Sequence, residues 1–177
     1  MTASQLSAPA HIPQPSRPPQ LTPLRPHEFF AVPWSGEGEW IASPWLRRLA
    51  RRPRRFSFGT STTWLSEDVW LVHDTLTWED GGTEHRSGVA RLAAEDRISL
   101  SYEDMLGGTD LHLRADGFTF SPYQIMVAMP PLPFPIVIAA RDHCEWRAAS
   151  EELIDTIELR LFGVPVGRMV MRLRPAH

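Results

Sequence analysis

Residues 141–145 place five ionisable side-chain types in one short segment, the strongest sign of chemistry in this sequence. Alternate side chains of a strand point to opposite faces, so Asp142 and Cys144 share one face and the other three the opposite face. Ile136 and Ile138 lie on the face of Asp142, which predicts a buried carboxyl that needs an arginine or tyrosine partner. Such a carboxyl can act as a general acid or base. The alternative interpretation is a solvated row of charges.

Two further aspartates follow the same pattern and are predicted as catalytic candidates beside Asp142. Asp74 alternates with Trp70 and Trp78. Its carboxyl therefore either lies among tryptophans and has a shifted pKa, or ends near the rim of a barrel. Asp104 continues the apolar face of Ile98 and is expected at the mouth of a cavity or as a turn-initiating residue.

Tyr123 is the first candidate for contact with a bound molecule. It shares its face with Ile125, Val127 and Met129, and an inward tyrosine hydroxyl can fix the one polar atom of an apolar ligand. The many aromatic residues can line a cavity or fill the core. The predicted ligand-binding residues are Tyr123, His85, Trp70, Trp78, Phe58 and Met129.

The elements that position these residues are predicted to be strands throughout. Short turn signals such as Asp116-Gly117 separate periodic segments, and no helix-length amphipathic stretch interrupts them. The expected strands are 54–65, 68–78, 83–93, 96–105, 109–115, 118–129, 134–147, 151–162 and 164–174, with another near residue 37. Sequential hairpins favour an all-β fold, a single antiparallel up-and-down barrel of about 9–10 strands.

The N-terminal part of the chain differs in composition. Residues 1–26 are rich in proline and are expected to form a disordered tail, followed by one barrel domain over 27–177. A short helix is predicted over residues 45–52, because Ser43 can cap it, Pro44 suits its first turn and Pro53 ends it.

Two short motifs near the first strand resemble the calycin superfamily, which includes lipocalins, fatty-acid-binding proteins and nitrobindin-like barrels. Gly38-Glu39-Trp40 is similar to the lipocalin G-x-W, whose tryptophan packs beside a late arginine; Arg168, Arg172 and Arg174 are candidates here. Trp34-Ser35-Gly36-Glu37-Gly38 is similar to the nitrobindin W-x-G-x-G. That resemblance implies haem held by a histidine of a late strand. Because residues 151–174 contain no histidine, we expect no haem and no other cofactor.

Composition excludes several classes of chemistry. All 18 basic residues are arginine and asparagine is absent, so a Schiff-base lysine, a P-loop lysine and an asparagine oxyanion donor are impossible. Cys144 is the only cysteine, which excludes an intramolecular disulfide. No histidine spacing matches a metal motif, and no metal is expected.

Net charge and targeting signals indicate which binding partners and which cellular location to expect. The net charge of −3 gives no global reason to expect nucleic acid or an anionic membrane. An arginine cluster over residues 47–55 is either a solvated face or a basic rim that steers an anionic ligand. No secretory signal is recognisable, so a cytoplasmic location is expected.

The leading functional prediction is binding of a small hydrophobic molecule, aromatic or fatty, inside a lipocalin-like barrel. The alternative is a cofactor-free isomerase, cyclase or lyase that uses carboxylate acid/base chemistry on a buried apolar substrate. A filled barrel acting as an interaction module is a third possibility. The sequence does not decide among these, nor does it reveal the ligand or the oligomeric state.

Overall fold

The structure is a computed structural model that describes residues 29–30, 32–44, 54–114, 116–128 and 133–176. These residues form one antiparallel sheet of eleven strands. The strands are β1 (Trp34–Ala42), β2 (Arg55–Ser66), β3 (Val69–Trp78), β4 (Thr83–Ala94), β5 (Arg97–Tyr102), β6 (Thr109–Arg114), β7 (Gly117–Phe120), β8 (Tyr123–Val127), β9 (Ile136–Arg147), β10 (Glu152–Leu161) and β11 (Val164–Pro175).

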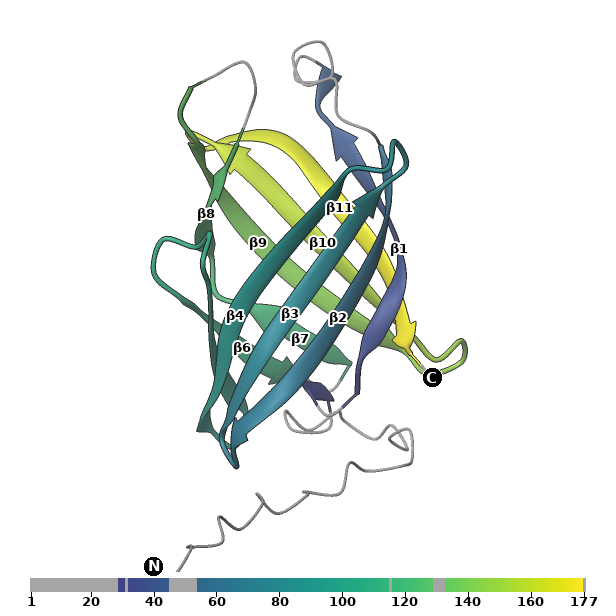
Figure 1. Ribbon diagram of the computed structural model, residues 1–177, viewed down its shortest axis with the longest axis vertical. Coiled ribbons are helices and arrows are strands. Elements are labelled where there is room, and N and C mark those ends of the chain that lie inside the picture. The colour runs from purple at the N-terminus through teal and green to yellow at the C-terminus, as the bar shows by residue number, and fades with distance from the viewer. Residues whose placement is uncertain (1–28, 31, 45–53, 115, 129–132, 177) are drawn as a thin grey trace, which may run out of the picture.

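The sheet closes into a barrel of ten strands. Its order runs β10-β11-β1-β2-β3-β4-β5-β6-β7-β9, and pairing of β9 with β10 joins the two ends. Figure 1 shows the long strands tilted around a common interior. Closure removes the unpaired strand edges that an open sheet would expose. The predicted all-β, antiparallel barrel is therefore confirmed.

One predicted strand, 118–129, is divided in the structure. β7 pairs with one end of β9 through Phe118 and Thr119, whereas β8 pairs with the other end from Tyr123 onward. The break falls at Ser121 and Pro122, because proline has no backbone N–H to donate to the ladder. Consequently β8 lies outside the ring of ten strands and continues β7 along β9.

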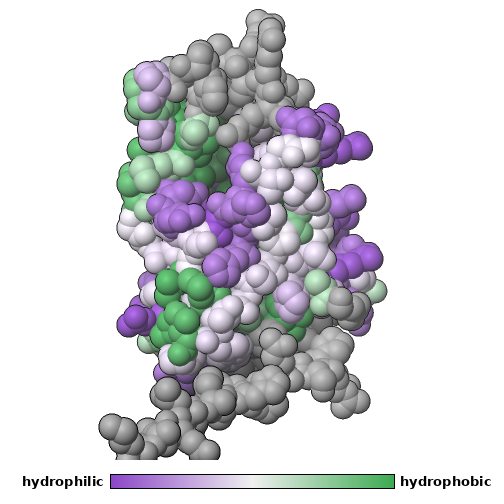
Figure 2. Space-filling model, in the orientation of Figure 1, coloured by the Kyte–Doolittle hydropathy of each residue, from purple (hydrophilic) through white to green (hydrophobic). Residues whose placement is uncertain are grey.

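The core occupies the barrel interior because inward positions alternate with outward ones along each strand. β3 shows this most clearly: Trp70, Val72, Asp74, Leu76 and Trp78 are all buried. The face in Figure 2 is mostly polar or pale, with apolar side chains gathered at the upper left, where Figure 1 places β8, and in a second patch at the lower left. The largest fully buried side chains are Trp34, Trp70, Phe118, Ile98, Leu111, Leu153 and Val166.

The glycines of the W-x-G-x-G segment permit close packing around β1. A Cβ on Gly36 would lie 1.8 Å from the carbonyl oxygen of Arg172 on β11, and a Cβ on Gly38 would lie 2.3 Å from the ring of Phe56. Both contacts are too short for any side chain. These glycines are therefore explained by strand packing, with Trp34 buried beside them.

Several expectations concern residues that the structure does not describe. The predicted tail over 1–26, the short helix over 45–52 and Met129 all lie outside the described residues. Within the part that is described, no helix has the length and apolar character needed to cross a membrane.

Candidate functional site

The barrel holds a cavity of about 100 Å³ whose lining is mostly apolar but includes a set of buried polar side chains. The apolar part of the lining combines aliphatic side chains with phenylalanine and tryptophan rings, and these come from segments far apart in the sequence. Its aromatic lining residues are Phe29, Phe30, Trp34, Phe58, Phe118 and Phe120. The polar side consists of carboxyl, hydroxyl, thiol and guanidinium groups.

The first polar group surrounds Asp74 of β3, whose side chain is buried. Burial raises the pKa of Asp74, although hydrogen bonds from Tyr102 and Thr60 and the charge of Arg86 oppose this rise. The pKa of Tyr102 is also raised well above its ordinary value, first by burial and then by the charge of Asp74. Tyr102 therefore stays neutral and serves as a hydrogen-bond donor to this carboxyl.

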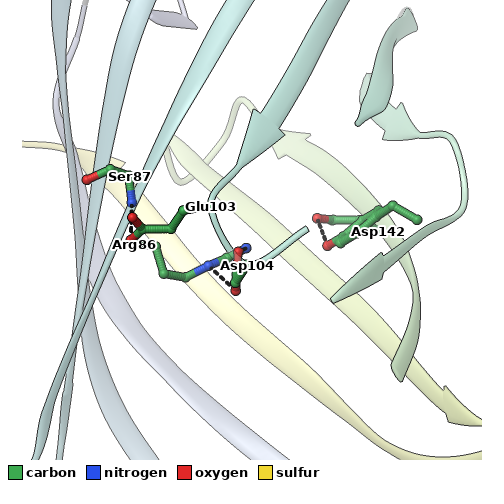
Figure 3. Close-up of polar contacts among 6 residues, drawn as sticks. Arg86, Ser87, Glu103, Asp104 and Asp142 are labelled. Carbon is green, nitrogen blue, oxygen red and sulfur yellow. Dashed lines mark hydrogen bonds and ion pairs between the residues drawn. The ribbon is translucent and has the colours of Figure 1, made fainter. Parts of the chain in front are cut away.

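The second polar group is the ion pair between Arg86 of β4 and Asp104, which follows β5 (Figure 3). Nη2 of Arg86 donates to Oδ1 of Asp104 at 2.9 Å, and Nε lies 2.9 Å from Oδ2. The guanidinium carbon also lies 4.4 Å from the ring centroid of Tyr102. Burial alone would lower the pKa of Arg86, but the bidentate contact with Asp104 more than offsets it and the pKa rises. Arg86 is therefore a permanent cation at the cavity wall.

The third polar group joins β8, β9 and β10. The hydroxyl of Tyr123 donates to Oδ2 of Asp142 at 3.3 Å, and Sγ of Cys144 lies 3.9 Å from Oδ1 (Figure 3 shows Asp142 on its strand). Asp155 on β10 faces Cys144 across the ladder. Burial raises the pKa of Asp142 well above its ordinary value, and the charge of Asp155 adds to the effect.

The two carboxyls of this third group share a proton. Burial raises the pKa of Asp155 as well, whereas hydrogen bonds from Asp142 and Cys144 lower it. Two buried carboxyls this close cannot both ionise readily, so one member of the pair keeps its proton to a higher pH than an ordinary aspartate. Oδ1 of Asp155 is buried and has no hydrogen-bond partner.

Cys144 and two neighbouring aspartates are the residues of this site that could hold a metal. Ligand atoms of Asp142, Cys144 and Asp155 lie within 4.8 Å of one another. Burial, followed by the charges of Asp155 and Asp142, raises the pKa of the Cys144 thiol well above its ordinary value. The thiol therefore remains protonated, which excludes it as an activated nucleophile in this state.

The structure brings some of the predicted site residues together. Asp74, Asp142, Tyr123 and Phe58 all line the cavity, although Asp74 comes from β3 and Asp142 from β9. The expectation that Asp142 needs a tyrosine partner is confirmed by Tyr123. Asp104 is engaged by Arg86, which itself lines the cavity.

Three other predicted ligand-binding residues lie away from the lining. Trp70 is fully buried and stacks on Phe30 with ring centroids 5.4 Å apart. Trp78 packs edge-on against Phe56 at 5.0 Å. His85 is exposed, and its Nδ1 lies 3.2 Å from the hydroxyl of Thr75. None of the three lines this cavity, and Trp78 lines a separate surface pocket together with Phe56.

Sequence reasoning missed several polar residues of the cavity, among them Arg86, Tyr102 and Asp155. A signal for Asp155 existed, because it alternates with Leu153 and Ile157 as Asp142 does with its isoleucines. The same rule applied to β4 places Arg86 on the inward face, but the polar character of that strand concealed it.

Neither a protein-family model nor a curated protein matches this sequence. The fold and the site define the class of protein as a closed ten-strand antiparallel β-barrel with a titratable interior cavity. This architecture is consistent with a calycin-like fold.

Proposed function

We propose that this protein binds a small, mainly apolar molecule inside the barrel. The observation that carries the proposal is the cavity itself, which lies within the ring of strands and is lined by apolar side chains together with buried polar groups. Binding pockets for small molecules typically combine an apolar lining with a few convergent polar groups. A ligand with one polar atom and an apolar body matches both parts of this lining.

The size of the cavity favours a ring over a long chain. Its volume is about 100 Å³, and an apolar protein cavity of about 150 Å³ accepts benzene. The cavity is smaller than that, so even a molecule with one ring requires the lining to widen somewhat, whereas a long acyl chain requires a much larger expansion of the barrel. Of the two predicted ligand types, the aromatic one is favoured.

Native mass spectrometry and thermal unfolding test this proposal. We expect a retained ligand in the purified protein, or a midpoint of unfolding that rises with added phenol or indole, because a ligand that binds only the folded state stabilises it. Val32→Phe, which adds a ring at the cavity lining, should reduce this shift. Val137→Phe, at an exposed position on β9, should leave it unchanged. Absence of any retained ligand and any shift would contradict the proposal.

Acid/base catalysis in the same cavity is the second candidate function. The observation in its favour is that buried carboxyls with raised pKa values, Asp74 and Asp142, line one cavity from different strands. Carboxyls with such pKa values serve as general acids or bases near neutral pH. Proton transfer at carbon is the step that cofactor-free isomerases, cyclases and lyases share.

Hydrogen exchange into a bound ketone tests this second function. In deuterated water, the protein should accelerate loss of an α-hydrogen from cyclohexanone, followed by NMR, by about a hundredfold over buffer. Asp142→Asn should abolish the acceleration, while Glu145→Gln, on the exposed face of the same strand, should retain it. Exchange at the buffer rate with the wild-type protein would count against catalysis and leave the binding function intact.

A further inference from the structure

Most donor side chains on the polar side of the cavity already have an acceptor; Nε of Arg86 makes no hydrogen bond, although it lies within ion-pair distance of Asp104. Tyr102 and Thr60 donate to Asp74, and Tyr123 donates to Asp142. The guanidinium of Arg86 is engaged by both carboxylate oxygens of Asp104. Two remaining donors of the lining, Trp34 and Thr62, are used by backbone carbonyls of Phe29 and Phe30.

Acceptors, by contrast, are in surplus. Asp74, Asp142 and Asp155 all line the cavity and are buried, with 8% of Asp155 exposed. Oδ1 of Asp155 has no hydrogen-bond partner. Among the described residues of the lining, Arg86 is the only cationic side chain, and it is paired with Asp104. A buried acceptor without a partner is costly, so a ligand that supplies an N–H donor and positive charge would complete this wall.

The aromatic side of the cavity is complementary to the same kind of ligand. The faces of aromatic rings carry partial negative charge and attract organic cations, most strongly where water is excluded. Phe29 packs against Phe30, Trp34 and Phe118, with ring centroids 4.9–5.2 Å apart, so several rings converge at this side. The lining therefore combines aromatic rings with buried carboxyl acceptors, the two kinds of group that bind organic cations.

We propose that the molecule held in the barrel is a small organic cation, a protonated primary or secondary amine on a one-ring apolar body, whose N–H donates to Oδ1 of Asp155. This inference rests on the proposed binding function and names the chemical class of its ligand. The ammonium neutralises the carboxylate of the pair while the ring packs among the phenylalanines. No covalent step is involved.

Three probes that differ mainly in charge test the proposal. Titration calorimetry at pH 7 would compare benzylamine, which is cationic, with benzyl alcohol and with benzoate. Benzylamine should bind about tenfold more tightly than benzyl alcohol, and benzoate should be the weakest, because only the cation can form a charge-assisted hydrogen bond with the unpaired oxygen. Asp155→Asn should reduce benzylamine affinity by about tenfold and change benzyl alcohol affinity little. Glu158→Gln, an exposed position on the same strand, is the matched control.

The outcomes separate this inference from the proposed function. If benzyl alcohol binds as tightly as benzylamine, the cation proposal is overturned while binding in the barrel stands. If none of the three probes binds and phenol and indole do not either, the binding function fails too. Zn²⁺ added alone provides a further arm, because Asp142, Cys144 and Asp155 are close enough to share a metal. Zinc binding without amine binding would overturn the proposal. If Asp155→Asn does not fold, the relative affinities of the wild-type protein for the three probes still test the proposal.

Discussion

Arg86→Met is expected to lower the free energy of unfolding by about 3 kcal/mol, because it removes one partner of a largely buried ion pair. The side chains of Arg86 and Asp104 are only 26% and 28% exposed, so water replaces the lost contacts poorly. The guanidinium also stacks on Tyr102 and lowers the pKa of Asp74 through its charge. Loss of the cation therefore leaves two acidic groups without compensation. Urea denaturation followed by tryptophan fluorescence measures the change.

Comparison with two variants isolates the ion pair. Arg91→Met, at an exposed position of the same strand, should change stability by less than about 0.5 kcal/mol. Adding Asp104→Asn to Arg86→Met should restore part of the lost stability, because the unpaired carboxylate is then removed. If Arg86→Met were no more destabilising than Arg91→Met, the pair would contribute nothing and the interior charge arrangement described here would be wrong.

Stability should fall as pH rises, which is the second large effect. The pKa values of Asp74, Asp142 and Asp155 are raised by burial in the folded protein relative to their ordinary value of 3.8. At pH values between this ordinary pKa and each raised pKa, the folded state binds more protons than the unfolded state. The free energy of unfolding therefore decreases with pH in that window, by about 1.4 kcal/mol per pH unit for each carboxyl concerned. The stabilisation is complete below about pH 4 and is lost as pH rises through the folded pKa values.

Asp142→Asn tests this sign directly. The amide keeps an oxygen that can accept from Tyr123 and an N–H that can donate to Asp155, but it cannot ionise. The variant should therefore be more stable than the wild-type protein at pH 8 and lose the advantage near pH 4. Chemical denaturation of both proteins between pH 4 and pH 8 measures the difference in their free energies of unfolding. The titration of surface carboxyls affects both proteins equally and cancels in this difference. Glu145→Gln, on the exposed face of β9, should not reproduce it. A pH-independent difference between Asp142→Asn and wild type would contradict a proton shared with Asp155.

Much of the fold was predictable because strand alternation is a local property. Each residue of a strand points opposite to its neighbours, so Trp70, Asp74 and Trp78 had to share a face whatever the rest of the chain does. The same rule placed Asp142 with Cys144 and called for a tyrosine or arginine partner. Turn residues then set the strand boundaries, and successive hairpins implied an antiparallel barrel. The break at Pro122 also has a local cause that is visible in the sequence, because proline has no backbone N–H to donate to the neighbouring strand.

The sequence by itself thus determined the antiparallel barrel and which side chains of each strand share a face. Only the tertiary structure decided which of those side chains meet across the interior, because the pairing of β1 with β11 closes the ring between strands distant in sequence. The β9–β10 hairpin places Asp155 beside Asp142, whereas barrel closure brings Asp74 of β3 to the same cavity. The folded barrel also pairs Arg86 with Asp104 and leaves Oδ1 of Asp155 without a hydrogen-bond partner. Spacing along a strand cannot reveal such contacts, since they depend on distances through the barrel interior.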